Sequence, residues 1–183
     1  MDEAGFVNTP ARRTTWGLVG KTPVLRISGR GWKKINAASA LTVSPGGRRG
    51  RRRRVGQHFQ LYEQNIDGPT FARFVRGLLR TVRGPVTIIW DGLRVHGAPP
   101  VRAVLAKRKG VEVYCLPKYA PELNPVEGVW ANGKEVKLRG VASDDIDDLE
   151  ADVHIVLEDI ARDQPLLRSF FNGTPLSVPG VTT

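Results

Sequence analysis

The sequence predicts an α/β fold in which an antiparallel part of the sheet comes first and parallel strands follow. Two strand-like segments, 35–43 and 55–62, flank a turn rich in glycine and arginine, which indicates a hairpin. Apolar residues at helical spacing over 71–82 then predict an amphipathic helix. The last pattern, strand, turn, helix and strand over 86–116, predicts two adjacent parallel strands.

Local signals support each element in chain order. Residues 3–31 are turn-rich, and Asp2 stands where a first strand would begin or end. Asp67 or Thr70 is expected to cap the helix over 71–82, and Gly84-Pro85 ends it. The continuous apolar run 86–90 is typical of a central strand.

The second half of the chain is predicted to be mostly helical. A helix over 99–109 precedes a strand over 111–116, which is expected to bury Cys115 in the core. Two further helices are expected over 125–138 and 143–161. Acidic residues crowd the beginning of the last helix, where the helix dipole favours them, and we interpret them as solvated.

Length and composition describe a single domain over residues 1–183. Hydrophobic residues make up 40% and charged residues 25%, as in a soluble globular protein. The apolar stretches fall far short of the roughly 18 residues that a membrane helix needs. The acidic start of the chain does not match a signal peptide, and a single cysteine excludes an internal disulfide. We therefore expect a cytoplasmic protein without a membrane partner.

The positive charge is concentrated in the first three quarters of the chain. Residues 1–142 hold 26 bases and nine acids, whereas residues 143–183 hold nine acids and two bases. This excess of positive charge in residues 1–142 favours binding of a polyanion, which is usually nucleic acid. A GC-rich genome is the alternative, but it accounts for the choice of arginine better than for the excess of charge. The expected hairpin tip concentrates the charge further and is either a phosphate contact, which we favour, or a solvated loop; its arginines are Arg48, Arg49, Arg51, Arg52, Arg53 and Arg54.

The segment 116–130 is the most informative part of the chain. Three prolines and Asn124 interrupt the preceding strand and predict an irregular loop. Asn124 suits a helix N-cap and Pro125 suits the first helical position. The loop therefore delivers Glu127 into the first turn of a helix, which indicates that this carboxylate has a specific role.

Asp91 is the second informative acid, because it ends the central strand where ligands collect in open α/β sheets. Glu127 follows the neighbouring strand, so both acids can reach the same sheet edge, and Asp2 is a third candidate. Converging carboxylates repel unless a divalent cation lies between them, and oxygen ligands suit Mg²⁺ or Mn²⁺. Two such ions support phosphodiester cleavage. Three scattered acids are nevertheless weak evidence for a metal-dependent nuclease, and their spacing alone leaves open that they have no catalytic role.

A series of motifs makes the interpretation more specific. It comprises Asp2–Phe6, Gly20–Pro23, Trp90-Asp91 with His96, and the segment 116–130 with Lys134. This series resembles the DDE transposases of the insertion sequence 630 group, in the Tc/mariner superfamily. The 35 residues between Asp91 and Glu127 are similar to the usual spacing of that family.

The resemblance implies an RNase H-like fold and a site of two Mg²⁺ or Mn²⁺ ions. By position, Asp2, Asp91 and Glu127 would be the catalytic metal ligands. The implied reaction is cleavage of double-stranded DNA at transposon ends and joining to TA targets. The implied assembly is a homodimer or a complex with an upstream N-terminal product, associated with the bacterial nucleoid when bound to DNA.

Several other residues lie in or beside these motifs, and most of them allow more than one role. His96 is expected to contact DNA, to orient Asp91 or to be structural. Lys118 is expected to bind DNA, and Lys134 is expected either to meet a phosphate or to be solvated. Trp130 is expected to pack the helix onto the sheet rather than to contact DNA, and Glu3 either to support Asp2 or to be exposed.

The chain also departs from the family pattern. It lacks the helix-turn-helix region that precedes the catalytic domain, and Gly92 stands where asparagine is common. Only Met1 precedes Asp2, so we expect a truncated first strand, a loosely held Asp2 and poor nuclease activity. The alternative function is a non-catalytic DNA-binding or oligomerising transposase fragment, inactive or inhibitory. A junction resolvase is a third possibility, against which the proline-rich motif argues.

Overall fold

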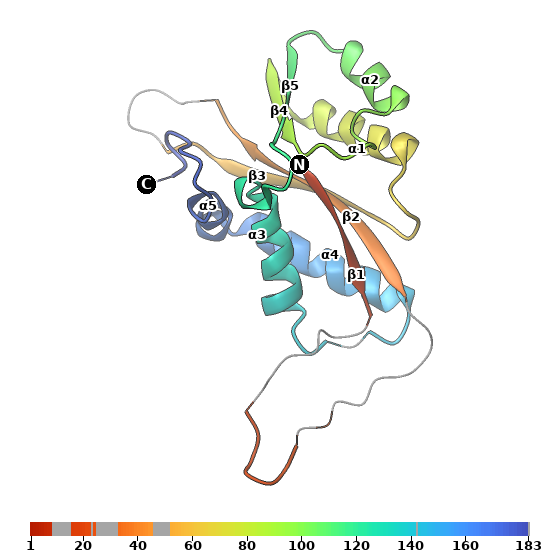
Figure 1. The fold of residues 1–183 in the computed structure, drawn as a ribbon, viewed down its shortest axis with the longest axis vertical. Coiled ribbons are helices and arrows are strands. Elements are labelled where there is room, and N and C mark those ends of the chain that lie inside the picture. The colour runs from red at the N-terminus through yellow and green to blue at the C-terminus, as the bar shows by residue number, and fades with distance from the viewer. Residues whose placement is uncertain (9–15, 23, 25–32, 46–51, 142, 183) are drawn as a thin grey trace.

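A computed structural model describes residues 1–8, 16–22, 24, 33–45, 52–141 and 143–182 (Figure 1). Strands β1 (Asp2–Val7), β2 (Lys34–Val43) and β3 (Val55–Tyr62) form an antiparallel sheet in that order. Strands β4 (Val86–Trp90) and β5 (Val111–Cys115) pair in parallel. The predicted order of antiparallel strands followed by parallel strands is confirmed.

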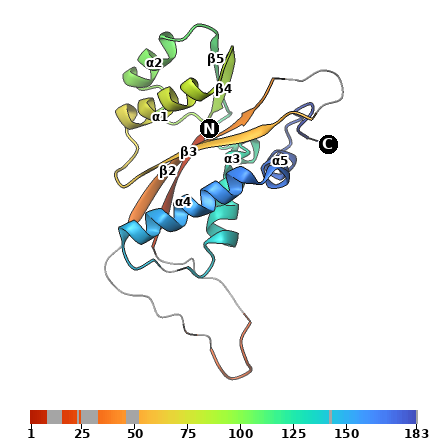
Figure 2. The same cartoon turned by 180° about the vertical axis from the view of Figure 1, so that it is seen from behind.

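The alternation of side chains along β2 builds two cores on opposite faces of the sheet. Ile35 and Ala37 belong to the core beneath α3 (Val126–Ala131), α4 (Ile146–Arg162) and α5 (Gln164–Asn172). Ala38 and Ala40 belong to the core beneath α1 (Gly68–Thr81) and α2 (Pro99–Ala106). Figure 2 shows the two groups of helices on either side of the strands.

Helix α1 begins and ends with specific side-chain contacts. The Asp67 carboxylate accepts a hydrogen bond from the Thr70 amide at 2.9 Å, which confirms Asp67 as the cap. At the other end, the Arg108 guanidinium donates to the carbonyl oxygens of Leu79, Val82 and Gly84. Arg108 follows α2, so this residue fastens the two helices of the same layer to each other.

The structure differs from the sequence-based expectation in the second half of the chain. The expected helix over 125–138 divides into α3 and a π-helical segment, η2 (Asn132–Lys137). Helix α2 ends at Ala106, before the turn that Gly110 makes with a φ of 75°. Helix α5 was not predicted; Asp163 both ends α4 and caps α5 through the Leu166 amide at 2.9 Å.

Strand β5 is not the buried strand that its apolar sequence suggests. Four of its five residues are exposed, including Cys115, because β4 is its only strand neighbour among the described residues. The prediction that Cys115 lies in the core is therefore wrong. A short apolar run does not reveal whether its strand lies at the centre or at the edge of a sheet.

Strand β1 joins the two sheets at the beginning of the chain. Asp2 pairs with Ser39 of β2, and the Met1 amino nitrogen donates to the Ile89 carbonyl of β4 at 2.9 Å. Asp2 is only 6% exposed. The expectation of a loosely held Asp2 is therefore wrong, because ladder pairing and burial hold this residue in place.

Helices that could cross a bilayer are not found in the described part of the chain, because none is sufficiently long and apolar.

Candidate active site

Three acids come from three elements that meet near the start of β1. Asp2 opens β1, Asp91 follows β4, and Glu127 lies in the first turn of α3. Burial, followed by the negative charge of Glu127, raises the pKa of Asp2 to about 6, while hydrogen bonds from Trp130 and Glu3 oppose this shift. Asp2 and Glu127 therefore lie within electrostatic reach of each other, although β1 and α3 are far apart in sequence.

Both oxygens of the Asp2 carboxylate accept hydrogen bonds. The indole Nε1 of Trp130 donates to Asp2 Oδ2 at 3.0 Å, and the Glu3 amide donates to Asp2 Oδ1 at 2.9 Å. The Trp130 ring meets Phe6 of β1 edge-on, with centroids 6.0 Å apart. The predicted packing of Trp130 onto the sheet is confirmed, and the hydrogen bond to Asp2 is a contact that the sequence did not reveal.

His96 joins β1 to the loop that carries Asp91. Its Nε2 lies 2.8 Å from Glu3 Oε1, and its Nδ1 lies 3.0 Å from Asp91 Oδ1 and 3.1 Å from the Asp91 carbonyl oxygen. The imidazole stacks on Phe71 and Trp90, with centroid distances of 4.5 and 5.0 Å. Because every partner is an acceptor, the imidazolium form satisfies both ring nitrogens.

The electrostatic surroundings of His96 agree with this hydrogen bonding. Burial by itself would lower the pKa of His96, but the hydrogen bond and charge of Glu3, together with Asp91, outweigh burial and raise the pKa. The side chain is 2% exposed, so its ring nitrogens face the two carboxylates rather than solvent.

Consecutive carboxylates on β1 therefore serve two different parts of the site. Successive side chains of a strand point to opposite faces. Asp2 meets Trp130 of α3 on one face, whereas Glu3 meets His96 on the other. This two-residue segment links the helix that carries Glu127 to the loop that carries Asp91.

The proline-rich loop places Glu127 through backbone hydrogen bonding. The Asn124 side-chain oxygen accepts from the Val126 amide at 3.2 Å, and its carbonyl accepts from the Glu127 amide at 3.0 Å. Asn124 thus performs the capping role predicted for it, although the regular helix begins at Val126. Gly128 allows α3 to approach α5, since a Cβ there would lie 2.6 Å from the Phe170 ring.

Comparison with known proteins places this geometry in a family. A family model described as DDE superfamily endonuclease matches residues 1–150. The chain belongs to the DDE superfamily of endonucleases. Curated protein sequences give no significant match to the chain.

Solved structures of the Mos1 transposase share the fold of this DDE endonuclease. The Mos1 strand transfer complex aligns with a TM-score of 0.63 and 17% identity over 93% of this chain and 49% of that one. The Mos1 mariner paired-end complex with Mn aligns with a TM-score of 0.64 and 18% identity over 95% and 51%. The RNase H-like α/β class is confirmed, and this chain spans about half the length of these structures.

The predicted DNA contact of His96 does not fit the structure of the endonuclease. The imidazole lies in the interior between Phe71 and Trp90, where a duplex cannot reach it. Stacking and two acidic partners account for its burial. Of the roles expected for His96, this position is compatible with orientation of Asp91 and with a structural role in packing.

The other basic residues predicted to bind DNA fall into three groups. Arg48, Arg49 and Arg51 lie outside the described residues. Arg52, Arg54 and Lys118 are exposed, and Arg53 is half-buried with its amide bonded to the Gly180 carbonyl at 3.0 Å. Their contact with DNA stays a prediction.

Lys134 is half-buried rather than fully solvated, and its contact with a phosphate stays a prediction. Its Nζ lies 5.2 Å from the centre of the Phe6 ring. Burial lowers the pKa of Lys134, and the charges of Glu127 and Asp2 partly offset this effect. The lysine thus contributes positive charge to the acid site from η2.

Tyr119 is a feature of the loop that the sequence did not single out. It is 99% exposed, and its φ of 60° is the only positive value at a non-glycine residue in the described chain. The neighbouring Pro117 and Pro121 are the only local sequence signal for an unusual backbone there.

The acids supply oxygen ligands, as Mg²⁺ or Mn²⁺ prefer. No three ligand side chains among the described residues are already arranged around one point. Asp91 Oδ1 accepts from the Leu93 amide at 3.1 Å as well as facing His96, and the Glu127 side chain is exposed. The donor chemistry therefore fits a divalent cation, with Glu127 the ligand freest to adjust.

Proposed function

We propose that this DDE endonuclease is a transposase catalytic domain that cuts double-stranded DNA at transposon ends and joins them to TA targets. The observation that carries the proposal is that β1 links the candidate acids: Asp2 binds Trp130 and lies within electrostatic reach of Glu127, while the adjacent Glu3 binds the His96 that faces Asp91. The Mos1 structures of similar fold are a strand transfer complex and paired-end complexes, which supports this reaction class. The motif series of the insertion sequence 630 group supports that subtype.

Asp2, Asp91 and Glu127 would hold Mg²⁺ or Mn²⁺, and two ions are expected from the family resemblance. Such ions would activate an attacking water or 3′-hydroxyl and stabilise the leaving oxygen. The residues of the chain prepare the candidate ligands. Trp130 donates a hydrogen bond to one oxygen of Asp2, and His96 faces one oxygen of Asp91 at 3.0 Å. Lys134 offsets part of the negative charge before a cation or a phosphate arrives.

Double-stranded DNA is the proposed substrate and partner. The proposed assembly that acts on it is a homodimer or includes an upstream N-terminal product. The net charge of +10 supports a polyanionic partner. The TA target and the nucleoid association follow from the family resemblance alone.

Alanine substitution of the acids tests this function. We expect Asp91→Ala and Glu127→Ala to lower Mg²⁺-dependent cleavage of a transposon-end duplex by at least about 100-fold while duplex affinity is kept. Glu122→Ala removes an exposed acid from the same loop and should cleave like the parent chain. Cleavage that survives both site substitutions would contradict the assignment.

The alternative function is a non-catalytic DNA-binding or oligomerising fragment. The observation that favours it is that the acids are not already arranged as a cation site in the described residues. A parent chain that binds duplex DNA without cleaving it, in Mg²⁺ and in Mn²⁺, would support this alternative. The expectation of poor nuclease activity rested on a loose Asp2, and its burial removes that reason.

A further inference from the structure

The unit formed by α1, β4 and α2 carries nearly unopposed positive charge. Residues 68–110 contain nine bases and a single acid, Asp91. Arg108 is engaged in holding the end of α1. The remaining eight basic side chains are all exposed: Arg73, Arg76, Arg80, Arg83, Arg94, Arg102, Lys107 and Lys109.

Three of these arginines form a row on the outer face of α1. Arg73, Arg76 and Arg80 are spaced by three and four residues, which places them on one side of the helix over a length of about 10 Å, and Arg83 follows just beyond the end of α1. In the described chain, Arg76, Arg80 and Arg83 form no ion pair. Arg73 donates a hydrogen bond to the Thr70 hydroxyl, and, after the hydrogen bonds from Thr70, its positive charge contributes to the lowered pKa of Asp67.

This arrangement is unfavourable for an isolated helix. Like charges three or four residues apart destabilise a helix. The helix dipole favours the bases near the C-terminal end of α1, but it gives no such benefit to Arg73 and Arg76 in the first half. A solvated helix face usually mixes acids with bases, and α1 contains no acid. A bound polyanion would remove the repulsion.

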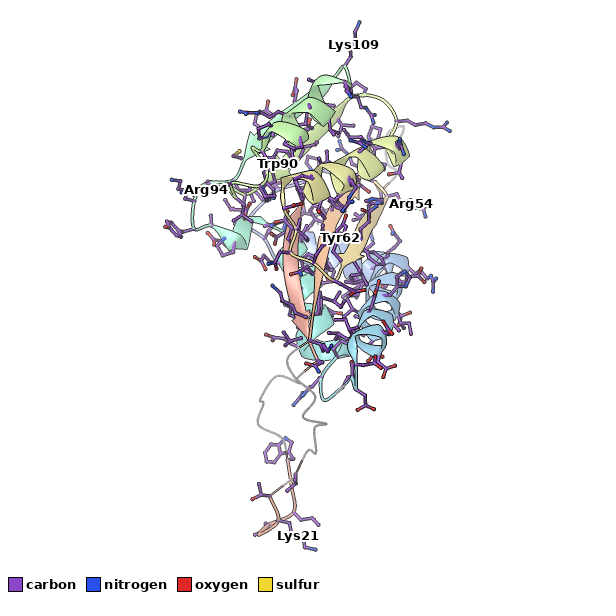
Figure 3. All side chains as sticks on the ribbon, turned by 90° about the vertical axis from the view of Figure 1, so that its right-hand side faces the viewer. Lys21, Arg54, Tyr62, Trp90, Arg94 and Lys109 are labelled. Atoms are coloured by element: carbon purple, nitrogen blue, oxygen red, sulfur yellow. The ribbon has the colours of Figure 1, made fainter. Side chains whose placement is uncertain are left out.

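The opposite face of the sheet has the opposite charge. Helix α4 contains six acids and one base, Arg162, and it packs on the other side of the β1–β3 sheet from α1. A polyanion is therefore attracted to α1 and repelled from α4. Figure 3 shows α1 and α2 together on one side, with Lys109 at the tip and Arg94 toward the loop after β4.

We propose that the outer faces of α1 and α2 with the bases that follow each helix, here named the α1–α2 surface, bind the phosphate backbone of duplex DNA outside the acid site; its residues are Arg73, Arg76, Arg80, Arg83, Arg102, Lys107 and Lys109. A row of about 10 Å faces on the order of six phosphate charges of a duplex, one per about 1.7 Å of its axis. The contact reads charge rather than sequence, so it positions the duplex. The inference rests on the proposed DNA substrate but not on catalysis.

Two double variants with equal loss of charge test the surface. Arg76→Gln/Arg80→Gln removes two bases from α1. Lys137→Gln/Arg162→Gln removes two bases from the acidic side, where they pair with Asp159 at 3.9 Å and Glu158 at 2.5 Å. The measurement is the dissociation constant of a mixed-sequence duplex for each full-length chain at several salt concentrations.

We expect Arg76→Gln/Arg80→Gln to weaken duplex binding about tenfold at low salt and to reduce the slope of log affinity against log salt by roughly 1 to 2. The control should keep the parent slope, and Arg76→Lys/Arg80→Lys should retain most of the binding. Thermal melting checks that the fold persists.

An unchanged slope in Arg76→Gln/Arg80→Gln, or an equal loss in the control, would overturn the α1–α2 surface alone. If the parent chain binds no duplex at all, the proposed function fails with it. If Asp91→Ala abolishes cleavage but keeps the parent slope of log affinity against log salt, the acid site and the α1–α2 surface contact DNA separately, as proposed.

Discussion

His96 Nε2 lies 2.8 Å from Glu3 Oε1, which links two residues 93 positions apart and joins β1 to the loop after β4. The other ring nitrogen faces Asp91, so the imidazole bridges a strand residue and a candidate metal ligand. A carboxylate held in this way has its orientation set before any cation arrives. The same principle operates in metalloenzymes, where partners beyond the ligands typically change affinity or activity by 10–100-fold.

Replacing His96 with phenylalanine should separate orientation from packing. His96→Phe keeps an aromatic ring against Phe71 and Trp90 but leaves Asp91 without its partner. We expect Mn²⁺ affinity, measured by electron paramagnetic resonance, and transposon-end cleavage to fall about 10–100-fold. His58→Phe is the matched control, because His58 packs on Phe74 at 5.4 Å and contacts none of the three acids. Equal losses in both variants would show that only packing matters.

The contact between Trp130 and Asp2 should contribute to stability. Trp130→Phe keeps an aromatic ring but removes the donor to Asp2 Oδ2. A double-mutant cycle with Asp2→Ala, followed by urea unfolding, should give a coupling free energy of about 1–3 kcal/mol, as expected for a hydrogen bond to a charged group. Additive losses in the double variant would mean that the two side chains act independently.

Gly128 should tolerate no side chain without movement of α3. A Cβ at Gly128 would lie 2.6 Å from the Phe170 ring, so Gly128→Ala should cost about 1–3 kcal/mol in the free energy of unfolding. Because Glu127 is the neighbouring residue, cleavage should decrease as well. Gly133→Ala is the control, since its Cβ would meet Phe6 and Val156 at ordinary distances of 3.6 and 3.7 Å. A stable Gly128→Ala with parent activity would contradict the tight contact between α3 and α5.

His58 should make stability depend on pH. Burial lowers the pKa of His58, and its buried Nε2 has no hydrogen-bond partner. The neutral ring is therefore favoured in the folded state. The stabilisation is complete above the unfolded pKa of about 6.5 and is lost as the pH falls through the lower folded pKa. Between pH 8 and pH 5, the urea midpoint of the parent chain should fall relative to the midpoint of His58→Phe. A difference between the two midpoints that stays constant with pH would refute this role.

Much of the fold followed from local sequence patterns. Strands β2 and β3, helix α1 with its Asp67 cap and the parallel pair β4–β5 were all predicted, because periodicity and capping depend on residues close in sequence. The loop that presents Glu127 was predicted for the same reason, and its motif also led to the DDE endonuclease family.

Only the tertiary structure decided how the acids are held. The bond between Trp130 and Asp2 spans 128 positions, and no local pattern indicates it. The sequence left His96 with several roles, and its burial between two aromatic rings argues against the DNA contact. Cys115 was expected in the core because apolar strands at the centre and at the edge of a sheet look alike. The sequence therefore determined the elements and the candidate acids, whereas strand pairing and helix packing, which join residues distant in sequence, determined their partners.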